Sequence, residues 1–153
     1  MPHIHEKVDF TVEVFIVYKD KVLLRMHDKF KIWLSVGGHI ELDEDPVKAA
    51  IREVKEEVGL DINIVGEVPV FDDDDYSYLQ SPRYLGKHLV NDTHQHIVFV
   101  YFATSKTDNI AEAGSDHEKS ETKWVTKEEL ASMGLRPNVL HLATKALEEL
   151  GTK

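Results

Sequence analysis

The feature that most constrains the fold is residues 45–60, which carry a full set of helix signals. Asp45 and Pro46 are residue types that begin helices, as the N-cap and the first helical residue. Gly59 is placed to end the helix, and Leu60 can pack back on its last turn. The apolar residues in between recur at helical spacing and are expected to face a core: Val47, Ala50, Ile51, Val54 and Val58.

Segments typical of β-strands lie on both sides of this helix. Alternating or β-branched residues predict strands at 10–18, 21–27, 61–70, 97–102 and 122–125, and 32–34 is a short apolar stretch ahead of Gly37 and Gly38. On the first strand, Val12, Val14 and Ile16 share one face. The run 97–102 is continuously apolar, as expected for a central strand buried on both faces. Thr126 is expected to cap a short helix, and Pro137 to open a final one. The sequence therefore predicts a single α+β domain over 1–153, with a mixed sheet between helices.

A long loop is predicted over residues 71–87. The acidic run 72–75 within it is expected to be a solvated turn, although an accessory metal site is an alternative. Aromatic side chains in the loop are suited either to stacking on a base or to packing beneath the loop: Phe71, Tyr76, Tyr78 and Tyr84.

Composition excludes several classes of protein. The net charge of -10 disfavours binding to a nucleic acid polymer, because the surface repels polyanions. No apolar run approaches the roughly 20 residues that span a bilayer, and the N-terminus has no apolar signal segment. With no cysteine, the chain has neither disulfides nor a thiolate nucleophile. A cytoplasmic protein without membrane association is expected, and a small anionic substrate would need a cation or a local basic patch.

Three carboxylates define the candidate chemistry. Glu53, Glu56 and Glu57 are three and four residues apart, so they share one face of the predicted helix. Like charges at this spacing destabilise a helix, whereas a divalent cation would require them. Carboxylate oxygens suit hard ions such as Mg²⁺. A solvated, glutamate-rich face would also explain these residues taken alone.

The segment 38–60 resembles the Nudix box, G-x5-E-x7-R-E-U-x-E-E-x-G-U, in which U is a bulky aliphatic residue. Every constrained position is filled: Gly38, Glu44, Arg52, Glu53, Val54, Glu56, Glu57, Gly59 and Leu60. The resemblance implies an α/β/α sandwich with a central mixed sheet. It also implies metal-dependent hydrolysis of a nucleoside diphosphate linked to another moiety.

The resemblance further implies roles for individual residues. The metal ligands for Mg²⁺ or Mn²⁺ would be the three box glutamates, with the carbonyl of Gly38. Arg52 and Glu44 would form a pair that positions the catalytic helix. The general base would be Glu53, with Glu118 as the candidate outside the box and Glu121 third.

Residues on the substrate side are less defined by the sequence. Arg25 and His27 alternate along one strand, and His39 lies within the box, so each can contact phosphate or simply face solvent. His94 and His96 form a His-x-His pair that can bind zinc, but the sequence shows no third ligand.

The sequence leaves the leaving group open. A nucleoside triphosphate is slightly favoured over ADP-ribose, a dinucleoside polyphosphate or a nucleotide sugar. The alternatives to a hydrolase are a Nudix-fold module that senses a nucleotide and an isomerase, which the lack of cysteine disfavours. A homodimer is left open.

Overall fold

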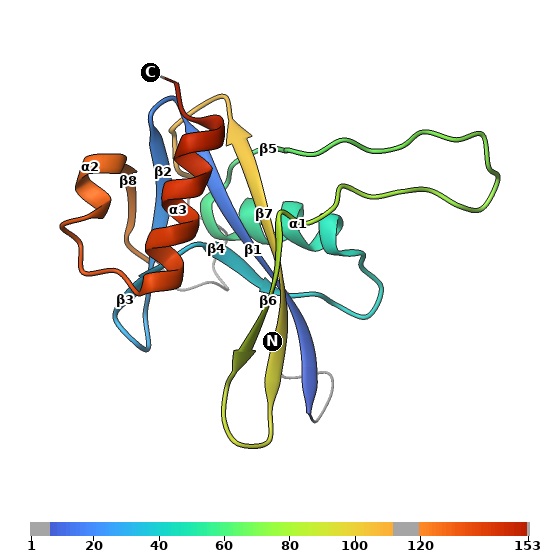
Figure 1. The fold of residues 1–153 in the computed structure, drawn as a ribbon, viewed down its shortest axis with the longest axis horizontal. Helices are drawn as coiled ribbons and strands as arrows, with labels where there is room; N and C mark the ends of the chain where they lie inside the picture. The colour runs from blue at the N-terminus through green and yellow to red at the C-terminus, as the bar shows by residue number, and fades with distance from the viewer. Residues whose placement is uncertain (1–6, 112–119, 153) are drawn as a thin grey trace.

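The computed structural model describes residues 7–111 and 120–152, and the fold is that of these residues. Their eight strands form one sheet, and three helices accompany it (Figure 1). The elements are β1 (Val8–Tyr18), β2 (Lys21–His27), β3 (Ile32–Leu34), β4 (Val36–His39), α1 (Pro46–Val58), β5 (Ile62–Ile64), β6 (Tyr84–Leu89), β7 (Gln95–Ser105), β8 (Thr122–Thr126), α2 (Lys127–Leu130) and α3 (Pro137–Leu150).

The sheet is mixed, as predicted. Its strand order is β3-β2-β1-β7-β5, with β4 paired to β1, β6 to β7 and β8 to β2. The long strands β1 and β7 run parallel, while the other pairs are antiparallel. Pairing of β1 with β7 brings the N-terminal part of the chain against a strand from its second half.

The two faces of the sheet pack against different helices. On β1, Val14 and Ile16 belong to the core that includes Val54 of α1. The alternate residue Phe15 belongs to a second core, which includes Ala143 of α3. Since successive strand residues point to opposite faces, α1 and α3 cover opposite sides of the sheet. This confirms the predicted α/β/α arrangement.

The helix α1 begins and ends where the sequence predicted. The Asp45 side chain accepts a hydrogen bond from the backbone N–H of Lys48 at 2.8 Å, and Gly59 adopts the left-handed conformation at φ 70°. The prediction that Ile51 faces the core is wrong, because this side chain is 47% exposed. It shares a solvent-facing stripe with Lys48 and Lys55, three and four residues away, and Ala49 is buried instead.

The observed strand boundaries differ most from the predicted ones where a strand pairs with a partner distant in the sequence. The predicted strand 61–70 is confined to β5, and residues 65–83 then leave the sheet as an arm that projects from the body (Figure 1). β6 begins inside the predicted loop 71–87 and runs beyond it to Leu89, because antiparallel pairing with β7 holds it in the sheet. β4, which contains Gly37 and Gly38, was not predicted as a strand.

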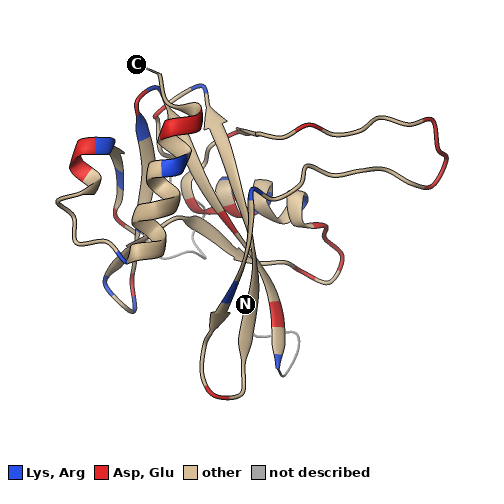
Figure 2. Ribbon diagram, in the orientation of Figure 1, with Lys and Arg blue, Asp and Glu red and all other residues tan. Residues whose placement is uncertain are grey.

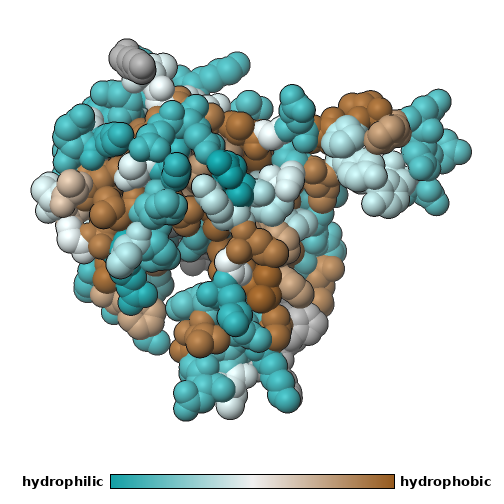
Figure 3. Space-filling view, in the orientation of Figure 1, coloured by the Kyte–Doolittle hydropathy of each residue, from teal (hydrophilic) through white to brown (hydrophobic). Residues whose placement is uncertain are grey.

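The arm is exposed along much of its length. The acidic run 72–75 lies at its tip (Figure 2) and is exposed, as a solvated turn would be. Apolar surface accompanies these charges (Figure 3): Val70 is 92% exposed. Tyr78 contacts Phe71 and Tyr76, with ring centroids 5.9 and 5.2 Å away. These aromatic side chains therefore pack on one another within the arm.

Among the described residues, no helix is both long and apolar enough to cross a membrane.

Candidate metal and active site

A glycine pair in β4 allows the helix and the sheet to meet closely. Gly38 lies opposite Val12 of β1, and Gly37 lies opposite Glu13. A Cβ on Gly37 would collide with the carbonyl oxygen of Val12, and a Cβ on Gly38 would collide with the carboxylate of Glu53. Only glycine fits at Gly37, where the obstacle is backbone, whereas a side chain at Gly38 would displace the Glu53 carboxylate. The β4 strand thus places the Gly38 backbone against one of the predicted metal ligands.

Arg52 is the centre of an ion-pair network that joins α1 to the segment before it. Its guanidinium donates to both carboxylate oxygens of Glu44, at 2.6 and 2.8 Å, and to the carbonyl of His39 at 3.0 Å. It also donates to Glu53 at 3.0 Å and to Glu56 at 3.1 Å. The hydrogen bond from Arg52 lowers the pKa of Glu44, and the same bond raises the pKa of Arg52. The predicted contact between Arg52 and Glu44 is therefore present.

Two of the three box glutamates are largely withdrawn from solvent. The Glu57 side chain is 9% exposed, and burial raises its pKa to about 8. The guanidinium of Arg25, 2.9 Å away, opposes this rise, whereas the charge of Glu53 adds to it. Burial also raises the pKa of Glu53, while Glu56 is more open to solvent. Burial therefore makes ionisation of this pair costly without a further positive charge.

The carboxylate cluster fits a divalent cation. Its donors are oxygen atoms only, which is the set that Mg²⁺ and Mn²⁺ prefer. A cation beside Glu53 and Glu57 would favour their ionised forms and so offset the cost of burying them. The residues that could hold it are those that the sequence predicted: Gly38, Glu53, Glu56 and Glu57.

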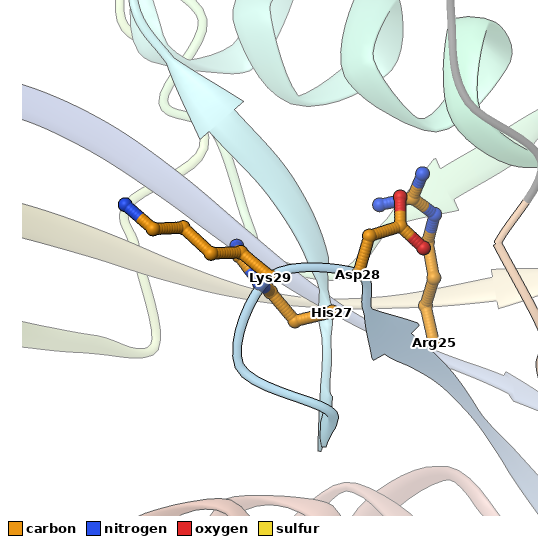
Figure 4. A pocket seen from close by; sticks show the side chains of 4 residues that line it. All are labelled: Arg25, His27, Asp28 and Lys29. Atoms are coloured by element: carbon orange, nitrogen blue, oxygen red, sulfur yellow. The ribbon is translucent and has the colours of Figure 1, made fainter.

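A hollow of about 440 Å³ lies at the end of β2, lined by Arg25, His27, Asp28 and Lys29 (Figure 4). Arg25 and Asp28 point the same way in this view, and Lys29 extends in another direction. Arg25 therefore borders both the hollow and the glutamates. The Nδ1 atom of His27 accepts a hydrogen bond from the backbone N–H of Phe30 at 3.3 Å, which holds this ring at the turn.

Of the two candidate general bases outside the box, the structure describes Glu121 but not Glu118. Glu118 lies outside the described residues. Glu121 is exposed, and its carbonyl accepts a hydrogen bond from the backbone N–H of Met26 at 2.8 Å, so it lies where β8 meets β2. Asp28, which sequence reasoning missed, accepts a hydrogen bond from Ser120 at 3.0 Å. Nothing in the local sequence around Asp28 indicates this contact.

The predicted histidines come together at another place. His39, His94 and His96 lie around Asp9 of β1, a residue that the sequence analysis did not single out. The interpretation that His94 and His96 have no third partner is therefore wrong. The register of β1 against β7 places Asp9 beside His96, and no local sequence signal reveals that pairing.

This combination of fold and site defines a class of protein. A mixed sheet lies between helices, and a glycine-bearing strand abuts a helix that carries clustered glutamates, as in Nudix domains. The family model of the NUDIX domain matches residues 9–147, and the chain belongs to that family.

A crystal structure of a NUDIX-family hydrolase from Clostridium perfringens is similar throughout. The two chains are 38% identical with a TM-score of 0.80, and the match covers 93% of this chain and 97% of the other. The solution structure of the E. coli ORF135 protein is 20% identical with a TM-score of 0.60. It covers 94% of this chain and 91% of that one, and shows the shared fold alone.

Among curated proteins, the dihydroneopterin triphosphate diphosphatase of Haemophilus influenzae is similar over a shorter stretch. It is 39% identical over 88 residues, which is 55% of each chain. The chain thus spans about half the length of this curated relative.

Proposed function

We propose that the protein is a metal-dependent hydrolase that cleaves a phosphoanhydride bond in a small, nucleotide-like diphosphate substrate. The observation that carries this proposal is a pair of largely buried carboxylates beside β4: Glu53 lies against Gly38, and Glu57 accepts a hydrogen bond from the backbone of Gly37. Similarity to a NUDIX-family hydrolase over most of the chain supports it. A triphosphate is the favoured substrate class, and the dihydroneopterin triphosphate diphosphatase activity of the Haemophilus influenzae relative agrees with that preference.

The metal would be Mg²⁺ or Mn²⁺, held by Glu53, Glu56, Glu57 and the Gly38 carbonyl. When bound, it would neutralise charge on the diphosphate and act as a Lewis acid. Arg52, tied to Glu44, keeps the glutamate-bearing face of α1 in register with β4.

In this proposal Arg25 contacts both Glu57 and the substrate. It holds Glu57 through Nη1 at 2.9 Å and also borders the hollow at the end of β2. A guanidinium has five N–H donors, so it can hold the glutamate and a phosphate oxygen together. His27 and His39 are the further candidates for contact with substrate.

A carboxylate must take the proton of the attacking water. We assign this step to Glu53, because its carboxylate lies at the proposed metal site, against the Gly38 backbone. Its contact with Arg52 holds the carboxylate in a fixed orientation. Glu118 is the alternative base.

The test is a product-resolved screen with Mg²⁺ or Mn²⁺. The panel contains nucleoside triphosphates, a pterin triphosphate, ADP-ribose, dinucleoside polyphosphates and nucleotide sugars. We expect release of a monophosphate from at least one compound, and complete loss of turnover in EDTA. Tight nucleotide binding with no turnover anywhere on the panel would favour a sensing module instead.

Replacing Arg52 by alanine is expected to lower activity and stability together. The change removes five hydrogen bonds and leaves Glu44, 11% exposed, without its cation. The free energy of unfolding should fall by about 1–3 kcal/mol, as expected for a charged group deprived of its partner. Metal binding should be partly retained, since Arg52 cannot be a ligand.

Lys55→Ala is the matched control on the same helix. Lys55 pairs with Asp61 at 3.1 Å, but both groups are exposed, so this pair is worth about 0–1 kcal/mol. Urea unfolding, metal titration and steady-state kinetics compare the two variants. Wild-type turnover in Arg52→Ala would show that the network is unimportant for catalysis.

A further inference from the structure

A second cluster of metal-ligating side chains lies apart from the box glutamates. Asp9 of β1 pairs with His96 of β7 in the parallel register, and His94 comes just before β7. The turn between β6 and β7 fixes His94, because its carbonyl accepts hydrogen bonds from the backbone N–H groups of Val90 and Asn91 at 3.0 and 3.2 Å. Asp9 and the pair His94 and His96, from two distant parts of the sequence, thus meet on paired strands.

The geometry of this cluster is close to that of a metal site. One ligand atom from each of Asp9, His94 and His96 lies within 4.8 Å of the others. The His94 Nε2 atom is 3.3 Å from Asp9 Oδ2, which matches the separation of about 3.3–3.5 Å between ligands around tetrahedral zinc. His39 flanks the group, with Nε2 3.7 Å from the same oxygen. Small side-chain rotations would close the remaining distances.

The burial of Asp9 and His94 favours a role in metal coordination. Asp9 is 1% exposed and His94 is 7% exposed, so both polar side chains lie inside the protein. Burying a carboxylate is costly unless it is paired or coordinates a metal. Imidazole nitrogens suit zinc and other late transition metals, while Mg²⁺ prefers oxygen ligands throughout. The donor set therefore selects a different ion from the one that fits the glutamates.

The histidine cluster and the glutamates lie on opposite faces of the sheet. β1 pairs with β7 without interruption from Val8 to Val17, so Asp9 has the same facing as Phe15, which packs toward α3. Gly38, by contrast, presents its side-chain direction to α1, because a Cβ added there would meet the carboxylate of Glu53. β4 links the two sites, because the His39 carbonyl accepts a hydrogen bond from Arg52.

We propose that Asp9, His94 and His96 bind a zinc-like transition metal ion, with His39 at the edge of the site. The bound ion would tie β1 to the β6–β7 turn and steady the end of β4 that contacts Arg52. This proposal is independent of the hydrolytic function, because its readout is metal binding.

The experiment measures Zn²⁺ binding to the chelator-stripped full chain by competition with a chromophoric chelator, in excess Mg²⁺ to occupy oxygen-only sites. Wild type should bind one Zn²⁺ tightly. The double variant His94→Ala/His96→Ala should lose at least about 100-fold in affinity, since even the hydrogen-bonding partners of ligands contribute 10–100-fold. Cobalt substitution should give the strong visible absorption of a tetrahedral site in wild type only.

Two controls locate the site. His141→Ala removes an exposed histidine from α3, and Glu57→Gln alters the glutamate cluster; both should keep wild-type Zn²⁺ affinity. Equal binding by the double variant and wild type would overturn the proposal, as would loss of the site in Glu57→Gln.

A measurement on the unaltered protein guards against misfolding of the variants. Imidazole ¹⁵N resonances of wild type, followed by NMR during Zn²⁺ addition, should shift for His94 and His96 and stay in place for His141. Shifts confined to other histidines would overturn the assignment.

Discussion

Glutamine in place of Glu57 is expected to lower kcat for hydrolysis by at least about 10²–10⁴-fold, the range typical of a lost catalytic acid or base. The amide keeps the shape of the side chain but removes the charge that a cation needs. It also leaves the Arg25 guanidinium without its carboxylate partner at 2.9 Å. Glu56→Gln should be similarly damaging, because it removes another of the proposed ligands. Metal titration should show weaker Mg²⁺ binding in both variants.

The control for this experiment is Glu67→Gln, which makes the same chemical change at an exposed position on the arm. It should leave kcat near the wild-type value. Glu118→Gln should cost less than either ligand variant. If Glu118→Gln proves the most damaging change, the general base lies outside the helix and the assignment of Glu53 is wrong.

The second large effect links the same glutamate to stability. In EDTA, burial raises the pKa of Glu57 from 4.5 to about 8, with Arg25 opposing the rise and Glu53 adding to it. The folded protein therefore keeps a proton that the unfolded chain releases above its own pKa of 4.5. This contribution to stability is fully present below pH 4.5 and is lost as the pH rises to about 8. The loss should be on the order of a few kcal/mol.

Urea unfolding of metal-free protein at about pH 5 to 9 measures this effect, because exposed carboxylates of ordinary pKa stay ionised across that range. Glu57→Gln should have a flatter pH profile and should be more stable than wild type at the alkaline end. Parallel profiles for the two proteins would show that Glu57 does not carry the pH dependence.

Adding Mg²⁺ should reverse the order of the two proteins. A ligand that binds only the folded state stabilises it by about 2.7 kcal/mol at a hundred times its dissociation constant. For a domain of this size, the melting temperature of wild type should rise on the order of 5–10 °C. Glu57→Gln should gain much less. A KCl control at matched ionic strength separates binding from screening, and equal Mg²⁺ shifts would place the effect on the net charge of -10.

Local chemistry explains why the sequence determined α1 and its glutamates. The cap at Asp45, the proline after it and the left-handed Gly59 act through neighbouring backbone groups, so their effect can be read from adjacent residues. The spacing of Glu53, Glu56 and Glu57 needs nothing beyond helical geometry. Strands such as β2, with bounds as predicted, follow from alternation alone.

The contacts between α1 and the sheet at the candidate site depend on pairing between distant parts of the chain. Gly38 reaches Glu53 because β4 pairs with β1, a pairing that the sequence did not predict. Arg25 meets Glu57 because a strand end and a helix converge, and no spacing along the chain encodes that contact.

The cluster around Asp9 depends most on tertiary structure. Asp9 lies more than 80 residues before His94 and His96 in the sequence, and the parallel register of β1 with β7 brings them together. Hydrogen bonds between strands are chemically alike at every position, so a short sequence does not specify its partner strand or register. The burial of side chains on both faces of the complete sheet selects one pairing, and that selection exists only in the folded molecule.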